Sequence, residues 1–200
     1  MTVIRFATEA DATGILEIYA PYVRDTAVSF EESPPTPDEF RQRIARISAA
    51  YPYLVCEVDG NIAAYAYASS FRVRRAYRFS VELSIYVAKK QQGQGLGKSL
   101  YACLLDLLQK QGFYTAFGVI TLPNPASLNI HEKLGFTPAG VWRRSGYKLN
   151  AWHDVCLLEK ELQSPHPAPE PAEPLTVAAL QTRYGTDIAL TAVSCPKSGS

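Results

Sequence analysis

Three glycines, Gly93, Gly95 and Gly97, lie within five positions between an apolar stretch and an amphipathic one. Glycine lets the backbone approach a ligand closely, and the N–H groups at the start of a helix attract anions. The residues therefore predict a phosphate-binding loop, with a glycine-rich turn that binds no ligand as the alternative. The Walker A pattern and the dinucleotide-binding fingerprint both fail on spacing. The pattern Q-x-x-G-x-G fits, and it begins at Gln92.

A carboxylate, Glu82, precedes this loop on the predicted strand Val81–Val87. Side chains alternate along a strand, so Glu82, Ser84 and Tyr86 share one face. A carboxylate in a central strand loses part of its hydration, which raises its pKa and suits it to general-base catalysis. Glu82 is therefore the candidate base. The alternative is a glutamate at an exposed sheet position or one paired with an arginine.

Four further segments carry a family resemblance. Residues 118–136 read G-V-I-T-L-P-N-P-A-S-L-N-I-H-E-K-L-G-F, and residues 146–155 read G-Y-K-L-N-A-W-H-D-V. Together with F-S-V-E-L-S-I-Y-V at 79–87 and T-A-V-S-F-E at 26–31, they resemble the GNAT acetyltransferases. Within that superfamily they are similar to the phosphinothricin and methionine sulfone (sulfoximine) branch. The resemblance covers about residues 2–162 and leaves the C-terminal tail out.

This resemblance implies a fold and a reaction. The expected α/β GNAT fold has a mixed, mostly antiparallel central sheet, splayed at the acetyl-CoA site and flanked by helices. The expected reaction moves acetyl from acetyl-CoA to an amine by direct transfer in a ternary complex. Amines are mostly protonated near pH 7, so Glu82 would act as the base. His131 would protonate the leaving thiolate, orient the amine or assist Glu82, with a purely packing role as the alternative. Tyr86 is a weaker candidate donor.

The resemblance also implies a set of acetyl-CoA contacts. Backbone N–H groups near Tyr86 or Val87 would bind the thioester oxygen, and Asn124 would bind the pantetheine arm. Lys98 and Lys133 would approach the phosphates, unless they are ordinary solvated lysines. The full predicted set comprises Ile85, Tyr86, Val87, Gln92, Gly93, Gln94, Gly95, Leu96, Gly97, Lys98, Asn124 and Lys133.

The stretch F-R-V-R-R-A-Y-R-F at residues 71–79 concentrates four arginines before the Glu82 strand. Arginine binds carboxylates and phosphinates through a bidentate fork, so an anionic acceptor is expected, unless this is only a solvated basic loop. Arg75, Ala76 and Tyr77 are the predicted contacts, and Phe30 is a candidate apolar wall. An acceptor with an α-amine, a carboxylate and a tetrahedral polar end, as in phosphinothricin or methionine sulfoximine, is what the resemblance suggests.

Composition bounds the alternatives. The 200 residues are 47% hydrophobic and carry a net charge of +1, which argues against charge-driven binding to nucleic acid or to membranes. The four cysteines are widely spaced, so no metal site is expected. No signal peptide is recognised, so a cytoplasmic location is expected, and the family resemblance implies a homodimer. Two other functions stay open: acetylation of a protein N-terminus, polyamine or aminoglycoside, and a non-catalytic acetyl-CoA-binding module.

The elements that must position these residues follow from periodicity and turn signals. Strands are expected at 3–6, 53–58, 62–68, 81–87, 116–120, 137–141 and 152–159, and helices at 10–20, 37–49, 97–111 and 125–134. Thr36, Pro37 and Glu39 form a helix-start signal, and Asp59-Gly60-Asn61 predicts a hairpin. We expect a catalytic domain over 1–163, a proline-rich linker over 164–174 and a tail over 175–200. The tail holds a short helix at 177–184, and we expect it to be loose.

Overall fold

The computed structural model describes residues 1–164 and 171–185. Seven strands form one sheet in the order β1-β2-β3-β4-β5-β7-β6, with every adjacent pair antiparallel except β4 and β5. The strands are β1 (Thr2–Phe6), β2 (Tyr53–Val58), β3 (Asn61–Ser70), β4 (Ser80–Val87), β5 (Thr115–Thr121), β6 (Thr137–Lys148) and β7 (Ala151–Glu161). The predicted mixed, mostly antiparallel sheet is therefore confirmed.

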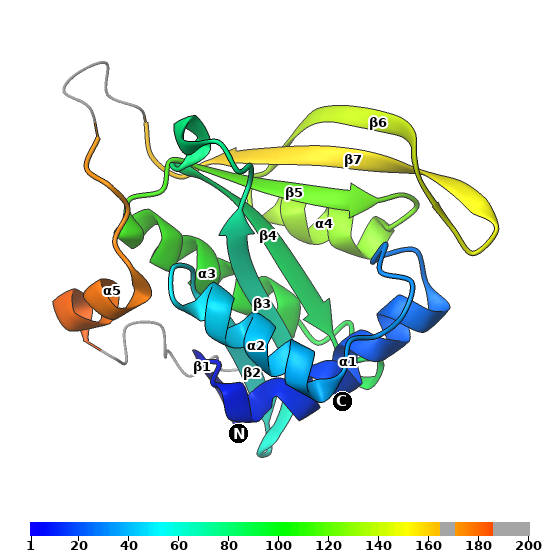
Figure 1. Cartoon of the computed structure of the whole chain (residues 1–200), viewed down its shortest axis with the longest axis horizontal. Coiled ribbons are helices and arrows are strands. Elements are labelled where there is room, and N and C mark those ends of the chain that lie inside the picture. The colour runs from blue at the N-terminus through cyan, green and yellow to red at the C-terminus, as the bar shows by residue number, and fades with distance from the viewer. Residues whose placement is uncertain (165–170, 186–200) are drawn as a thin grey trace, which may run out of the picture.

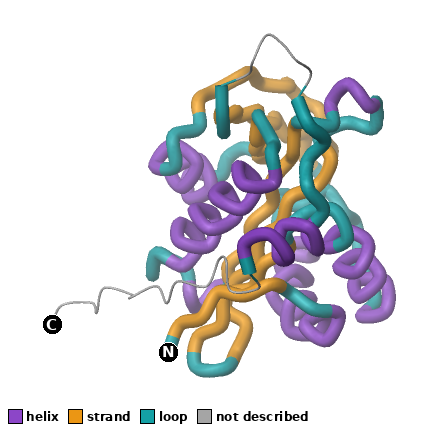
Figure 2. The backbone as a smooth tube through the Cα atoms, turned by 90° about the vertical axis from the view of Figure 1, so that its left-hand side faces the viewer, coloured by secondary structure: helices purple, strands orange, loops and turns teal. Residues whose placement is uncertain are grey.

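Helices cover both faces of this sheet (Figure 2). They are α1 (Ala12–Asp25), α2 (Pro37–Ser48), α3 (Leu96–Gln111), α4 (Pro125–Lys133) and α5 (Val177–Tyr184). On one face, α1 and α2 pack on Tyr53, Val55 and Tyr65. On the other, α3 packs on Leu54, Ala66 and Leu83. Successive side chains of β2 and β3 point alternately into these two apolar cores. Both strands therefore consist of nearly continuous runs of hydrophobic residues.

Two local signals read from the sequence are confirmed. Thr36 caps α2, because its side chain accepts from the N–H of Glu39, and Glu39 accepts in return from the Thr36 N–H. Asp59 and Gly60 form the two-residue turn between β2 and β3, both with positive φ, as a type I′ hairpin requires. These contacts depend only on neighbouring residues, which is why the sequence alone locates them.

Two elements are longer than predicted. Helix α1 continues past Pro21 to Asp25, because the exposed proline costs only local backbone bonding while Val23 is buried in the core. Strands β6 and β7 form a long hairpin that reaches the turn at Leu149 and Asn150, both with positive φ. Most of β6 is exposed, so its side chains lack the alternation that marks a half-buried strand.

Part of the tail, which we expect to be loose, packs against the domain in the structure. Helix α5 docks beside α3 (Figure 1), and Val177 and Leu180 are buried there. The Leu175 N–H donates to the Gln111 carbonyl, and the Gln111 side chain donates back to the Leu175 carbonyl. Two apolar side chains and this reciprocal pair hold the segment. The expected linker residues 165–170 and the tail residues 186–200 lie outside the described part of the chain.

Candidate active site between strands β4 and β5

The parallel strands β4 and β5 separate partway along their length. They pair only from Ser80 to Leu83 with Thr115 to Gly118, whereas β4 continues to Val87 and β5 to Thr121. Figure 1 shows the two strands starting together and then diverging. Beyond Leu83 and Gly118, each strand therefore presents backbone groups that the other strand does not bind. The predicted splay is present in the centre of the sheet.

A cavity of about 410 Å³ occupies this gap. Its walls come from β4, the glycine loop, the start of α3, the end of β5 and α4. It brings together twelve predicted site residues, namely Ile85, Tyr86, Val87, Gln92, Gly93, Gly95, Leu96, Gly97, Lys98, Asn124, His131 and Lys133. The other predicted residues do not line it: Gln94, Glu82, Phe30, Arg75, Ala76 and Tyr77.

The glycine loop begins helix α3 at the mouth of this cavity. Gly95 has φ of +80° at the helix N-cap, a conformation that other residues rarely adopt. The first helical residues, Leu96 and Gly97, line the cavity and present helix N-terminal N–H groups near it. Gln92 donates to the Tyr22 hydroxyl, which itself donates to the Val87 carbonyl at 2.7 Å. This chain of bonds holds the loop against the end of β4.

The direction of the β4 N–H groups follows from one hydrogen bond. The Ala88 N–H donates to Ala63 on β3 at 2.8 Å. Because successive N–H groups of a strand point in opposite directions, those of Val87 and Ile85 point away from β3 and into the gap. The gap therefore has two backbone donors along one wall, where a carbonyl oxygen or an amide could be bound. The sequence placed these donors near Tyr86 or Val87.

Glu82 lies beside the closed end of the gap, one residue before Leu83. It shares the face of β4 that carries Tyr86, which packs in the α1–α2 core. The Glu82 side chain is half-buried, and this burial raises the pKa of its carboxyl above the usual value. The positive charge of Arg72 opposes the shift and lowers the pKa. Glu82 therefore has the electrostatic environment of a base poised closer to neutrality than an exposed carboxylate.

His131 lies on the opposite face of the sheet and is almost completely buried. Its Nδ1 lies 2.8 Å from the Ser127 carbonyl, an acceptor, so Nδ1 carries the proton and Nε2 presents a lone pair. Burial lowers the pKa of His131, which favours this neutral form. Gly118 makes the placement possible, because a Cβ there would lie 2.6 Å from Nε2. A neutral, lone-pair-bearing Nε2 is a poor acid toward a leaving group.

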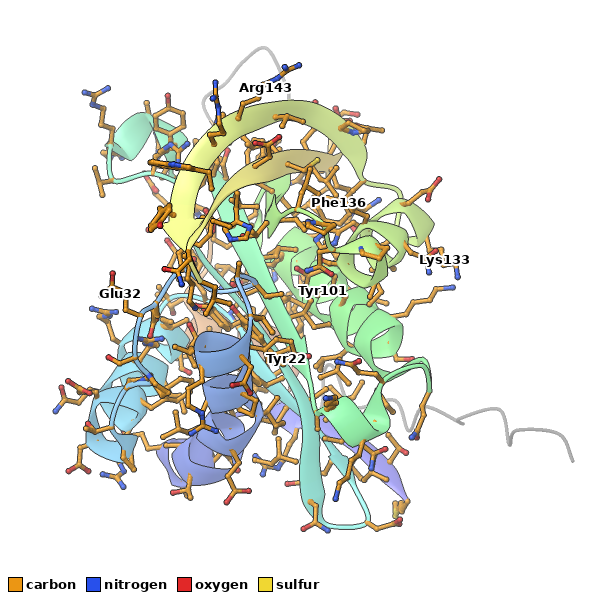
Figure 3. All side chains as sticks on the ribbon, turned by 90° about the vertical axis from the view of Figure 1, so that its right-hand side faces the viewer. Tyr22, Glu32, Tyr101, Lys133, Phe136 and Arg143 are labelled. Carbon is orange, nitrogen blue, oxygen red and sulfur yellow. The ribbon has the colours of Figure 1, made fainter. Side chains whose placement is uncertain are left out.

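Asn124 and the two lysines occupy different parts of the site. The Asn124 side-chain oxygen accepts from the Ser127 N–H and caps α4, which leaves its Nδ2 to donate to a ligand. Lys98 and Lys133 line the cavity yet are exposed to solvent. Figure 3 shows Lys133 at the outer edge of the molecule and Tyr101 in its middle. The two exposed lysines are therefore placed to contact a negatively charged group at the outer end of a ligand, and not to take part in a reaction inside the cavity.

Comparison with known proteins identifies the family of this chain. The family model described as the acetyltransferase (GNAT) domain matches residues 4–157. The chain belongs to the GNAT acetyltransferase family. It is similar to the phosphinothricin N-acetyltransferase of Streptomyces viridochromogenes, with 40% identity over 86% of this chain and 94% of the relative.

Two further GNAT relatives agree with this match. The L-methionine sulfoximine/L-methionine sulfone acetyltransferase of Salmonella typhimurium is 34% identical over 84% of this chain and 98% of the relative. The crystal structure of a phosphinothricin acetyltransferase from Sinorhizobium meliloti, in complex with AcCoA, superposes with a TM-score of 0.81 at 37% identity. The superposition covers 86% of this chain and 95% of the Sinorhizobium chain. The predicted family and enzyme class, an acetyl-CoA-dependent N-acetyltransferase, are therefore confirmed.

The predicted acceptor contacts of this GNAT enzyme are not gathered in the cavity. Arg75 lies in a short 3₁₀ turn, η2 (Arg75–Tyr77), with its side chain 75% exposed and paired with Glu173 of the proline-rich segment. Arg78 pairs with the same carboxylate at 3.0 Å. Arg72 instead acts electrostatically on Glu82 and stacks near the ring of Trp142 on β6. Of the four arginines, Arg72 is therefore the one tied to the candidate base.

Phe30 lies between the α1–α2 loop and the β6–β7 hairpin. It packs so closely over Gly146 that a Cβ there would lie 2.2 Å from its ring. The buried Lys148 ammonium fastens the two segments, because it donates to the Val23 and Ser29 carbonyls at 2.7 and 2.6 Å. The hairpin and the loop are thus held as one wall. Phe30 is part of that wall and does not reach the cavity.

Removing the charge of Arg72 is expected to shift the pH dependence of catalysis. A base works when deprotonated, so activity should fall as the pH drops through the pKa of Glu82. Without the Arg72 charge that pKa rises further, and the acid limb of kcat/KM for Arg72→Gln should move to higher pH. Arg74→Gln, at an exposed position two residues away, is the matched control and should leave the limb unchanged. An unmoved limb in Arg72→Gln would contradict the assignment of Glu82.

Sequence reasoning missed thirteen of the residues that line the cavity, among them Tyr22, Val28 and Tyr101. Tyr22 and Tyr101 lie on helices whose hydrophobic pattern makes a tyrosine read as ordinary core. Val28 lies in the T-A-V-S-F-E segment that carries the family resemblance, which is a signal that could have identified it.

Among the residues that the structure describes, no group of three or more His, Cys, Asp or Glu side chains could hold a metal ion, and no helix is long and apolar enough to cross a membrane.

Proposed function

We propose that this GNAT enzyme acetylates the α-amine of a small amino acid that carries a second, tetrahedral polar end. The relatives named for phosphinothricin and for methionine sulfoximine or sulfone support this acceptor class. The observation that carries the proposal is the splayed gap, which leads from a helix N-terminus suited to phosphate to a closed end beside which Glu82 lies. An acyl donor in the gap and an amine beside Glu82 could then meet without a covalent enzyme intermediate.

In the proposed binding of acetyl-CoA, successive parts of the molecule contact successive walls of the cavity. The pyrophosphate would contact the N–H groups of the glycine loop, with Lys98 and Lys133 near the charged end. The pantetheine arm would run along β4, where the N–H groups of Ile85 and Val87 point into the gap, and would meet Asn124 on the other side. One of the two N–H groups would also stabilise the oxygen of the tetrahedral intermediate.

Glu82 is the proposed base, acting directly or through one water on the attacking amine. Its position on the α1–α2 face, opposite the wall that holds His131, supports an amine approaching from that side. Arg72 is the proposed partner of the acceptor carboxylate, since it already acts on Glu82. Arg75, Ala76, Tyr77 and Phe30 are weaker candidates, and Arg75 would first have to leave Glu173.

We also propose that the enzyme is a homodimer that acts in the cytoplasm, where its acyl donor is available. Support for association comes from the β6–β7 hairpin, which exposes several large apolar side chains on a single projection. They are Val141, Trp142, Tyr147, Leu149 and Trp152. A second copy of the chain covering this hairpin would remove these side chains from water.

The acceptor proposal is tested by release of CoA thiol from acetyl-CoA in the presence of a panel of amines. The panel contains phosphinothricin, methionine sulfoximine, methionine sulfone, spermidine, an aminoglycoside and a short peptide. We expect saturable release with the first three alone, with a lower kcat/KM in Arg72→Gln. Release only with spermidine, the aminoglycoside or the peptide would overturn the acceptor class and keep acetyl transfer. Tight acetyl-CoA binding with no release from any amine would favour the non-catalytic module.

A further inference from the structure

The Tyr22 hydroxyl joins two parts of the cavity wall that come from different segments. It donates to the Val87 carbonyl at 2.7 Å and accepts from the side-chain amide of Gln92 at 2.9 Å. Val87 is the last residue of β4, and Gln92 begins the glycine loop. All three residues line the cavity. A side chain of α1 therefore links the end of β4 to the loop that is suited to phosphate.

These bonds are part of one continuous chain. The Val87 carbonyl and the Ala88 N–H belong to the same peptide group, and that N–H donates to the Ala63 carbonyl of β3 at 2.8 Å. The donors of Gln92, Tyr22 and this peptide group thus follow one another head to tail toward β3. Hydrogen bonds arranged in this way polarise and strengthen one another. The first residue of the glycine loop is therefore anchored in the central sheet.

The glycines that follow Gln92 are not held by packing. Gly93 and Gly95 both have positive φ, and a Cβ at either position would meet nothing within 4 Å in the part of the chain that the structure describes. Glycine loses more conformational freedom on ordering than any other residue, so holding such a loop in one conformation costs free energy. An anchor that fixes the loop before a ligand arrives lowers this cost and raises the affinity. Gln92, bonded to Tyr22, supplies such an anchor directly before Gly93.

Tyr22 is itself held from two sides. It lies in the last turn of α1, where the Thr26 hydroxyl donates to the Tyr22 carbonyl at 2.6 Å and satisfies a group that the helix leaves unpaired. Its ring packs edge to face on Tyr86 with centroids 5.2 Å apart, and the next residue, Val23, is completely buried. A side chain whose backbone and ring are both fixed can hold another residue in a defined position.

We propose that Tyr22 is a positioning residue for the acyl donor. Its hydroxyl holds Gln92, and with it the glycine loop, in the conformation that presents the loop N–H groups to the pyrophosphate of acetyl-CoA. Tyr22 acts through Gln92 and touches none of the reacting atoms, so it contributes to the affinity for the donor and not to the acetyl-transfer step. The inference rests on the proposed binding of acetyl-CoA in this cavity and deepens it.

The first test is the affinity of Tyr22→Phe for CoA, measured by calorimetric titration without an acceptor. The substitution keeps the ring and removes the bonds to Gln92 and Val87, so the Kd should rise about 3- to 30-fold, which corresponds to the loss of one or two hydrogen bonds. The matched control is Tyr19→Phe, one turn earlier on α1. The Tyr19 hydroxyl also has a hydrogen-bond partner, Ser29 at 2.7 Å, but Tyr19 does not line the cavity.

The two variants separate a positioning role from a general loss of stability. Each loses a bonded hydroxyl on the same helix, so both should unfold slightly below the parent temperature. Only Tyr22→Phe should bind CoA more weakly. If Tyr22→Phe does not fold, Gln92→Met, at an exposed position, breaks the same link from its other end and should raise the Kd by a similar factor.

A double-mutant cycle shows whether Tyr22 acts through Gln92 or contacts the ligand itself. If Tyr22 only holds Gln92, Tyr22→Phe/Gln92→Met should bind CoA about as weakly as the weaker of the two single variants. If the Tyr22 hydroxyl contacts CoA independently, the two increases in Kd should multiply. Multiplied increases would overturn the positioning role.

Steady-state kinetics provides a second readout that a structural role alone would not change. With any amine of the panel that is acetylated, Tyr22→Phe should raise KM for acetyl-CoA by about the same factor as the Kd and leave kcat within about threefold of the parent. A fall of kcat at saturating acetyl-CoA with an unchanged KM would place Tyr22 in the reaction step and overturn the inference.

The binding measurements also separate this inference from the proposed function. A Kd of Tyr22→Phe within about twofold of the parent, or an equal increase in Tyr19→Phe, would overturn the role of Tyr22 and leave acetyl transfer untouched. Failure of the acceptor panel with the expected change in CoA affinity would instead count against the proposed acceptor alone. A parent enzyme that binds no CoA would overturn the proposed donor site and this inference with it.

Discussion

Replacing Glu82 by glutamine is expected to lower kcat/KM for the amine by about 10²- to 10⁴-fold, the usual contribution of a positioned general base. The substitution keeps the shape of the side chain and removes its ability to accept a proton. The remaining activity should lose the acid limb of its pH profile, because no group with the raised pKa of Glu82 is left to titrate. Steady-state kinetics at several pH values would measure both effects.

Folding should not suffer in this variant. The pKa of Glu82 is raised in the folded state, so the folded protein binds its proton more tightly than the unfolded chain does. The stability that this carboxyl contributes is therefore present at low pH and is lost as the pH rises through the folded-state pKa. At neutral pH, Glu82→Gln should unfold at the same temperature as the parent or slightly above it. Glu17→Gln, at an exposed position of α1, is the control for both readouts.

An activity of Glu82→Gln above half that of the parent, with the acid limb intact, would remove Glu82 from the mechanism. A large loss of acetyl-CoA affinity would also contradict the assignment, because Glu82 does not line the cavity. In either case the base would have to be sought elsewhere. His131 would then be the next candidate to test, since its neutral Nε2 presents a lone pair and the residue lines the cavity.

Twelve of the residues that line the candidate cavity could be predicted from the sequence, because they lie in a few short segments. The loop from Gln92 to Lys98 and the α4 segment with Asn124 and His131 are short segments whose residue types and spacing carry the function. The pairing of β2 with β3 also follows from the Asp59–Gly60 turn. Sequence motifs predict a site well where one short segment determines both the local backbone conformation and the side chains that face the cavity.

The acceptor side could not be predicted equally well, because it depends on contacts between distant segments. Arg75 is paired with Glu173, which lies 98 residues further along the chain, within the proline-rich stretch. Four arginines in one loop cannot be told apart by sequence. What distinguishes Arg72 from Arg75 is its position beside Trp142 of β6, whereas Arg75 lies in η2. Tyr101 has the hydrophobic spacing of any core residue of α3. Only the packed structure distinguishes a tyrosine that faces a cavity from one that faces the core.

Substituting Gly118 by alanine is expected to destabilise the enzyme by about 1–3 kcal/mol and to reduce kcat at least tenfold. The added Cβ would lie 2.6 Å from His131 Nε2, closer than real contacts allow. The imidazole has little room to move, since Ser127 holds Nδ1 and the rings of Tyr101 and Phe136 pack against it. Any shift of the ring also moves the wall that carries the Tyr101 hydroxyl. Urea denaturation and steady-state kinetics would measure the two losses.

A double-mutant cycle separates this clash from a general effect of alanine in a strand. In Gly118→Ala/His131→Ala the methyl group enters the space left by the imidazole, so the combined loss of stability should fall short of the sum of the single losses by about 1 kcal/mol or more. Gly140→Ala in β6 is the matched control, because a Cβ there meets nothing within 4 Å. Additive losses would show that Gly118 is not required for the placement of His131. A coupled loss would show that a glycine in the central sheet is what admits a histidine, and with it Tyr101, to the closed end of the gap.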